Sequence, residues 1–199
     1  MTCALRKSVY AILLVSLVHS QNSAARDNDG KKAETPRSEG ISVIAGPNDH
    51  FPWDAHRKLS WDDFRGAINA STSESAAATH CGIGFKTNTT KPGHQPEIIV
   101  YNTFYAEKSW VKSDAKIPSI LDHEQGHFDL CEIFTRKLRS RMNNFDFNVP
   151  DVKQALMNIY SEISNEYEKC QQAYERETTH GTNIKEQKRW QQLMASQLI

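Results

Sequence analysis

The first half of the chain carries short apolar runs with the two-residue period of β-strands. Between residues 76 and 87, isoleucine and phenylalanine alternate with glycine and lysine, which predicts a strand. Residues 97–106 are rich in β-branched and aromatic side chains and predict the strongest strand of the chain. Two shorter apolar pieces, 42–45 and 59–61, are expected to form short strands or turns. These segments together predict a small antiparallel sheet.

The second half has the three-to-four-residue period of helices. A first helix is predicted over 119–143, with an apolar stripe formed by Leu121, Phe128, Cys131, Phe134 and Leu138. A second helix is predicted over 151–177, where His180 and Gly181 follow its end, and a third over 185–198. Because the strands come first and the helices afterwards, the expected fold class is α+β.

The N-terminus has the features of a secretory signal peptide. Arg6 and Lys7 precede ten apolar residues, 9–18, and a cleavage site is expected near Ser20 and Gln21. Ten residues are too few to span a bilayer, which needs about 20. We therefore expect a secreted or periplasmic protein with residues 1–20 removed. Residues 21–40 are polar and lack aromatic side chains, so they are expected to be a disordered linker before one domain over 41–199.

Length and charge narrow the possible functions. A chain of 199 residues accommodates one domain with a substantial core. Its 24 basic and 24 acidic residues cancel, so there is no electrostatic case for nucleic acid. No second segment is apolar enough to be transmembrane, so we expect no membrane contact after signal cleavage. The pattern does not specify the oligomeric state.

Three cysteines remain once Cys3 leaves with the signal peptide: Cys81, Cys131 and Cys170. An odd number leaves at least one unpaired within the chain. An oxidising compartment permits a bridge between Cys131 and Cys170. The alternative is that Cys131, which lies on the apolar stripe, is a small core residue.

The first predicted helix contains the chemistry that defines the candidate site. His123-Glu-Gln-Gly-His127 places two imidazoles four residues apart, on one face of a helix, where both can bind one Zn²⁺. Glu124 lies about 100° round the helix, beside the metal, where its carboxylate can act as general base towards a zinc-bound water. Pro118 and Ser119 supply a suitable helix start.

A catalytic zinc site needs a third protein ligand. If the second helix returns antiparallel to the first, residues 168–175 come level with the two histidines. The candidates are His180, which we favour for its ligand chemistry, then Glu175 and Glu168, with His80 a further possibility. Asp129 and Glu132 point elsewhere and are expected to orient ligands or face solvent, with Glu132 solvated.

The sequence resembles DUF922, a bacterial domain family identified as secreted zinc-dependent proteases on the strength of its motif. The matching pieces are 59–66 (Leu-Ser-Trp-Asp-Asp-Phe-Arg-Gly), Ser109-Trp110, 123–129, 174–181 (Tyr-Glu-Arg-Glu-Thr-Thr-His-Gly), Gln187 and Trp190. Glu175 stands where the family often has aspartate, which keeps a carboxylate at that position. The resemblance implies a zincin-like metallopeptidase and names no substrate.

These observations predict a zinc-dependent hydrolase, with a peptide or protein as its substrate. His123, His127 and His180 would hold Zn²⁺, and Glu124 would be the general base. Residues 97–106 are expected to offer an edge strand to an extended peptide, and Tyr174 and Tyr105 are candidates for stabilising an oxyanion. The alternatives are a non-catalytic zinc-binding or partner-binding module, which has no use for Glu124, and an amidase acting on cell-wall peptides.

Overall fold

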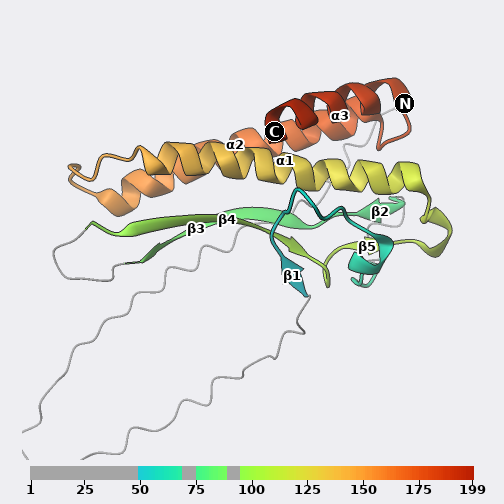
Figure 1. Cartoon of the computed structure of the whole chain (residues 1–199), viewed down its shortest axis with the longest axis horizontal. Coiled ribbons are helices and arrows are strands. Elements are labelled where there is room, and N and C mark those ends of the chain that lie inside the picture. The colour runs from blue at the N-terminus through green and yellow to red at the C-terminus, as the bar shows by residue number, and fades with distance from the viewer. Residues whose placement is uncertain (1–48, 69–74, 89–94) are drawn as a thin grey trace, which may run out of the picture.

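A computed structural model describes residues 49–68, 75–88 and 95–199 (Figure 1). The predicted signal peptide (1–20), linker (21–40) and apolar piece 42–45 lie outside the described residues, as does the start of the predicted domain at residue 41.

The sheet is small and antiparallel. Strands β1 (His50–Phe51), β4 (Glu97–Tyr105) and β3 (Cys81–Asn88) are hydrogen-bonded in the order β1-β4-β3. A separate two-stranded ladder joins β2 (Ala77–Ala78) to β5 (Trp110–Val111). The predicted strand at 97–106 is confirmed as β4, which lies between β1 and β3. Because β1 pairs only with Phe104 and Tyr105, residues 97–103 of β4 are still an edge on the side away from β3 among the described residues.

Residues 59–61 do not form the expected strand. Leu59 is buried in a loop, and Trp61–Asp63 forms a 3-10 helix. The local reason is a capping box, in which the Asp63 carboxylate accepts hydrogen bonds from the backbone N–H and the hydroxyl of Ser60.

Three helices follow: α1 (Pro118–Asn143), α2 (Val152–Thr178) and α3 (Ile184–Leu198). Each begins where its sequence favours a start. Pro118 occupies the first turn of α1, and the side chains of Asp151 and Asn183 accept hydrogen bonds from the first backbone N–H groups of α2 and α3. The α+β fold class is confirmed.

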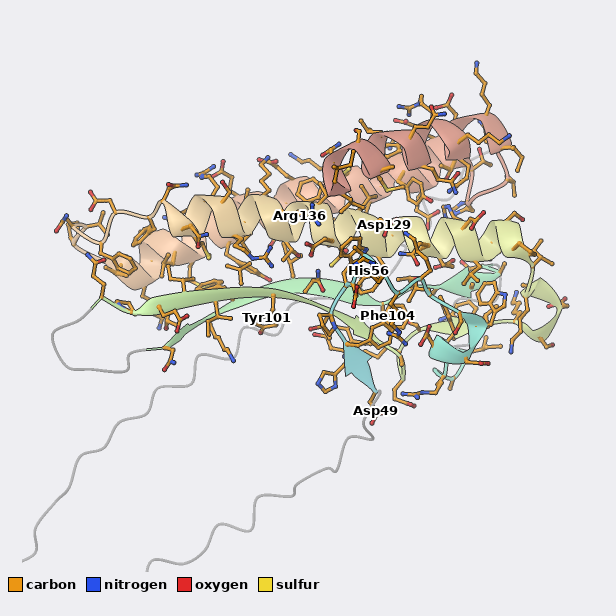
Figure 2. All side chains as sticks on the ribbon, viewed as in Figure 1. Asp49, His56, Tyr101, Phe104, Asp129 and Arg136 are labelled. Atoms are coloured by element: carbon orange, nitrogen blue, oxygen red, sulfur yellow. The ribbon has the colours of Figure 1, made fainter. Side chains whose placement is uncertain are left out.

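Helix α1 packs on the sheet, and α3 lies on the other side of α1 (Figure 1). Phe104 of β4 packs 5.4 Å from Phe128 of α1, and Asp129 and Arg136 lie further along the same helix (Figure 2).

Helix α2 runs alongside α1 and also reaches the sheet, where the ring of Tyr160 packs 5.6 Å from that of Phe85. Contacts along α1 and α2 run in opposite order, from Lys137 with Glu166 to His127 with Gln171, so these helices are antiparallel. The metal motif therefore lies on the helix that contacts the sheet, α2 and α3.

The three cysteines that the structure describes are unbridged. Cys81 and Cys131 are buried in the core beside Phe104, and Cys170 is partly exposed on α2. Of the two expectations for Cys131, the core residue is the one observed, and the bridge to Cys170 is not formed. Among the described residues, none of the helices has the length and apolar character that crossing a membrane requires.

Gly126 should tolerate no side chain. A Cβ atom at this position would lie 2.2 Å from the Tyr174 hydroxyl, so Gly126→Ala forces α1 and α2 apart and should lower the free energy of unfolding by about 1–3 kcal/mol. Denaturant unfolding measures this change. Gly82→Ala is the control, because its Cβ meets nothing nearer than 3.8 Å and stability should change little.

Candidate metal centre

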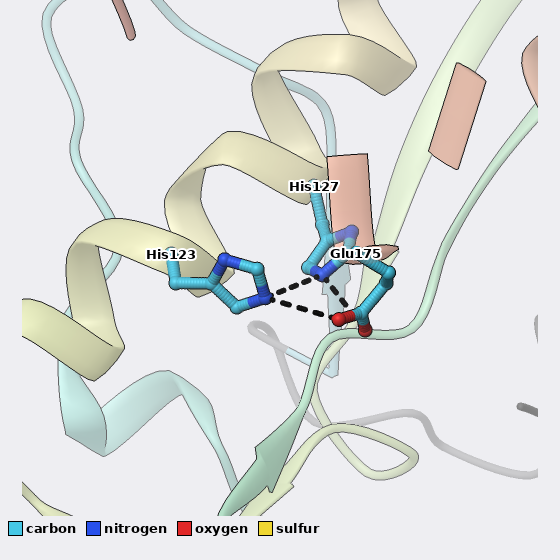
Figure 3. Close-up of side chains that lie close together, drawn as sticks. All are labelled: His123, His127 and Glu175. Atoms are coloured by element: carbon cyan, nitrogen blue, oxygen red, sulfur yellow. Dashed lines mark hydrogen bonds and ion pairs between the residues drawn. The ribbon is translucent and has the colours of Figure 1, made fainter. Parts of the chain in front are cut away.

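The two histidines of the motif converge as the helical spacing predicts. His123 and His127 are both buried, and their Nε2 atoms lie 3.2 Å apart (Figure 3). Because the side chains are four residues apart on α1, the rings share one face of the helix and point at the same space.

The third member of the cluster is Glu175 of α2. Its Oε2 lies 3.4 Å from His123 Nε2, and its Oε1 lies 3.4 Å from His127 Nε2 (Figure 3). His123, His127 and Glu175 form the one group of potential metal ligands found among the described residues.

His180, the favoured third ligand in the sequence, lies beside this cluster rather than in it. Its side chain is 75% exposed, and its Nδ1 lies 2.7 Å from Glu175 Oε2. The physical reason is that His180 follows the end of α2, whereas Glu175 is still on the helix face that packs against α1. Glu168, a less favoured candidate, is exposed and accepts a hydrogen bond from Gln172 rather than joining the cluster. His80 lies in the β2–β3 connection and is not part of the cluster either.

Glutamine side chains determine which ring nitrogens carry protons. Gln171 Nε2 donates to the backbone oxygen of His127 and to the Tyr167 hydroxyl, so its Oε1 accepts from His127 Nδ1 at 2.5 Å. Gln187 Nε2 donates to the Tyr174 hydroxyl, so its Oε1 accepts from His123 Nδ1 at 3.2 Å. Protons on both Nδ1 atoms leave both Nε2 lone pairs directed at each other and at Glu175, as a metal requires.

The spacing of the two ring nitrogens matches a tetrahedral zinc ion. Bonds of about 2.0–2.1 Å at tetrahedral angles separate neighbouring ligand atoms by about 3.3 Å. The Nε2 atoms lie 3.2 Å apart, and Glu175 approaches them with different oxygens, Oε2 at 3.4 Å from His123 and Oε1 at 3.4 Å from His127. Two buried nitrogen lone pairs facing each other at this distance repel unless a cation or a proton lies between them. The residues therefore fit a divalent metal.

The electrostatics of the cluster reflect the same convergence. Burial by itself would lower the pKa of His127, but the hydrogen bond and charge of Glu175 raise that pKa to about 9. Burial would raise the pKa of Glu175, but its contacts with His123 and His127 hold that pKa well below its usual range. Glu175 is therefore ionised and can only accept hydrogen bonds.

Glu124 has the surroundings expected of a general base. Its side chain is buried, and its Oε2 has no hydrogen-bond partner among the described residues. Burying an ionisable oxygen without a partner costs free energy, so such an atom is typical of a functional position rather than a structural one.

Neither tyrosine named from the sequence is placed to stabilise an oxyanion. Tyr174 is fully buried, its ring stacks on His123, and its hydroxyl donates to the His123 backbone oxygen while accepting from Gln187. Tyr105 is on the sheet, where Lys108 covers its ring. Tyr174 is instead part of the support beneath the metal motif.

The two acidic residues beyond the motif attach the 53–59 segment and the sheet to α1. Asp129 accepts from Trp53 Nε1 and Gln125 Nε2, both at 2.7 Å. Glu132, which we expected to be solvated, is buried and accepts from Asn102 and Arg136. The expectation for Glu132 is wrong because β4 brings a polar amide to that face of α1.

Sequence reasoning assigned no role to Gln171 and Gln187. One signal for Gln171 was available: it precedes Glu175 by four residues and so shares its helix face. Gln187 was noted only as part of the family resemblance, and its position beside His123 depends on how α3 packs.

Comparison with known families identifies the family of the chain. The model of a family described as bacterial protein of unknown function (DUF922) matches residues 62–181, more than half of the chain. The chain belongs to this family. The match includes the metal motif, Glu175 and His180. No curated protein and no solved structure matches the chain.

The metal-free protein should lose stability as the pH rises. The pKa of His127 is raised from 6.5 to about 9 on folding, so its stabilising contribution is complete below about pH 6.5 and is lost as the pH passes about 9. The loss should reach roughly 3 kcal/mol at most. Denaturant unfolding of chelator-treated protein at a series of pH values measures it. Glu175→Gln should flatten the profile, and an unchanged profile would contradict the assignment.

Removing the support of one ligand should weaken metal binding. Gln171→Leu leaves His127 Nδ1 without its acceptor and should reduce zinc affinity by about 10–100-fold in a chelator competition. Gln172→Leu is a matched control, because Gln172 is the next residue on α2 but is exposed and hydrogen-bonds Glu168 rather than a histidine of the motif. Equal affinity in the two variants would show that Gln171 does not orient the ligand.

Proposed function

We propose that this protein is a zinc-dependent hydrolase that cleaves peptide bonds. The observation that supports the proposal best is the convergence of His123, His127 and Glu175 at separations suited to tetrahedral zinc, with the buried carboxylate of Glu124 beside them. Two histidines and a glutamate are a ligand set of known catalytic zinc sites, which keep a fourth position open.

Each residue has a distinct role in this proposal. His123, His127 and Glu175 would hold the ion, which when bound lowers the pKa of a coordinated water to about 7 and polarises a carbonyl group. Glu124 would take up a proton from the attacking water and pass it to the leaving amine. A closed structural site has no need of that carboxylate, so Glu124 favours the hydrolase over a non-catalytic metal module.

The segment that would bind an extended peptide is β2 with the connection that joins it to β3. Thr79 Oγ1 in this connection donates to the Glu124 backbone oxygen over 3.3 Å, so the segment runs alongside the motif. The backbone oxygens of Ala76 and His80 accept hydrogen bonds from the side of β5 and β4. Successive residues of an extended chain direct their backbone groups to alternate edges, so those of Ala77 and Thr79 point to the opposite edge. Tyr160 of α2 donates to Ile83 on that edge, which places the edge on the α2 side. A peptide added there would lie near the metal ligands.

The predicted signal peptide supports action outside the cytoplasm, on secreted or cell-wall peptides. A cell-wall amidase would use the same centre, so substrate screening must include cell-wall material as well as proteins.

The decisive test compares the wild type with Glu124→Gln. The variant should retain one zinc ion per chain by metal analysis, because Glu124 is not a ligand. Its hydrolysis of casein, a peptide library or cell-wall material should fall by about 10²–10⁴-fold. Chelator should abolish wild-type activity, and added zinc should restore it.

Asp122→Asn is the matched control, since it alters an exposed acid next to His123 on the same helix and should keep full activity. Zinc-loaded wild type and Glu124→Gln that behave alike in every assay would rule out the hydrolase.

A further inference from the structure

The turn after α2 has an unusual backbone. Thr179, His180 and Gly181 have φ values of 50°, 54° and 78°, three consecutive residues in the left-handed region. Residues with side chains rarely adopt this conformation, and a β-branched threonine is a clear outlier. Strain of this kind persists where surrounding contacts impose it, often at functional sites.

The contacts that impose the turn press it against the metal centre. The His180 N–H donates to the Glu175 backbone oxygen at 3.1 Å, and the Gly181 N–H donates to the Thr178 hydroxyl at 3.3 Å. A Cβ atom on Gly181 would lie 2.8 Å from His123 Cβ, so the backbone at Gly181 lies directly on the ligand.

This turn brings the His180 ring to Glu175. A carboxylate that binds a metal is deprotonated and can only accept, so His180 Nδ1 donates to Glu175 Oε2 over 2.7 Å. The remainder of the His180 side chain is exposed, so the ring is not part of the hydrophobic core. Among the described residues, its side chain hydrogen-bonds the carboxylate of Glu175.

Glutamines hold the other two ligands in the same way. Gln187 accepts from His123, and Gln171 accepts from His127. We propose that His180 is the positioning residue for Glu175, which fixes the orientation of its carboxylate towards the metal. This inference rests on the proposed metal centre.

Three substitutions of His180 test the inference through metal binding. His180→Asn places an amide N–H near the position of Nδ1, whereas His180→Gln places its amide near that of Nε2. Zinc affinity by chelator competition should fall by about 10–100-fold in His180→Ala and His180→Gln, and His180→Asn should recover most of it. The visible spectrum of the cobalt(II) protein should shift in His180→Ala and return towards wild type in His180→Asn.

Thr179→Asn is the matched control, because it changes the same turn with a residue that tolerates the left-handed region, and zinc affinity should not change. Wild-type affinity in His180→Ala would overturn the inference. A loss well beyond about 100-fold in all three variants would also overturn it, because His180 would then be a ligand itself.

Different results would contradict the proposed metal centre and the proposed role of His180. A wild-type chain that binds neither zinc nor cobalt would contradict both proposals. Equal zinc affinity in the wild type and His180→Ala would contradict only the positioning role. A positive His180 result stands even if Glu124→Gln shows no loss of hydrolysis.

Discussion

The close approach of α1 and α2 at Gly126 is the constraint on which the metal centre depends. The Tyr174 hydroxyl occupies the space that a side chain at residue 126 would fill, and it donates to the backbone oxygen of His123. With the helices this close, Glu175, one position beyond Tyr174, reaches both imidazoles. A larger residue at position 126 would force the helices apart and move the Glu175 carboxylate away from the imidazoles, so the glycine inside the motif is needed for the three side chains to converge.

Around that contact, the protein buries several ionisable groups that would be more stable in water. His123, His127 and Glu124 are all buried, and Glu175 is mostly covered. Such burial is unfavourable unless each group has a partner. Gln187 and Gln171 accept hydrogen bonds from His123 and His127, and His180 donates one to Glu175, so each of the three converging side chains has a partner. The free Glu124 oxygen is the exception. The cluster therefore has the arrangement of a site that could hold a positive ion, at a cost to the stability of the fold.

Elements from distant parts of the sequence complete the surroundings of the centre. The β2–β3 connection, which contains Thr79, runs along one side of the motif, and the left-handed turn at His180 packs against His123 on another. Helix α3 contributes Gln187, which accepts a hydrogen bond from His123. The polar contacts of Asp129 and Glu132 hold the 53–59 segment and β4 against the opposite part of α1. Asp129 and Glu132, which follow the motif on α1, thus hold this helix in place. Residues far from the motif in the sequence, such as Gln171 and Gln187, orient the ligands.

The sequence alone determined the elements and half of the centre, because these depend on local periodicity. Four-residue spacing was enough to place His123 and His127 on one helix face, and the antiparallel return of α2 indicated which level of that helix to search. The sequence could not show whether Glu175 or His180 is the third ligand candidate, since both lie near that level and imidazole is the commoner zinc ligand. Only the tertiary structure decided this, because the choice depends on which residue faces α1 when Tyr174 packs over Gly126. The pairing of 97–106 with β3 and β1 and the burial of Glu132 were decided in the same way, by neighbours far away in the sequence.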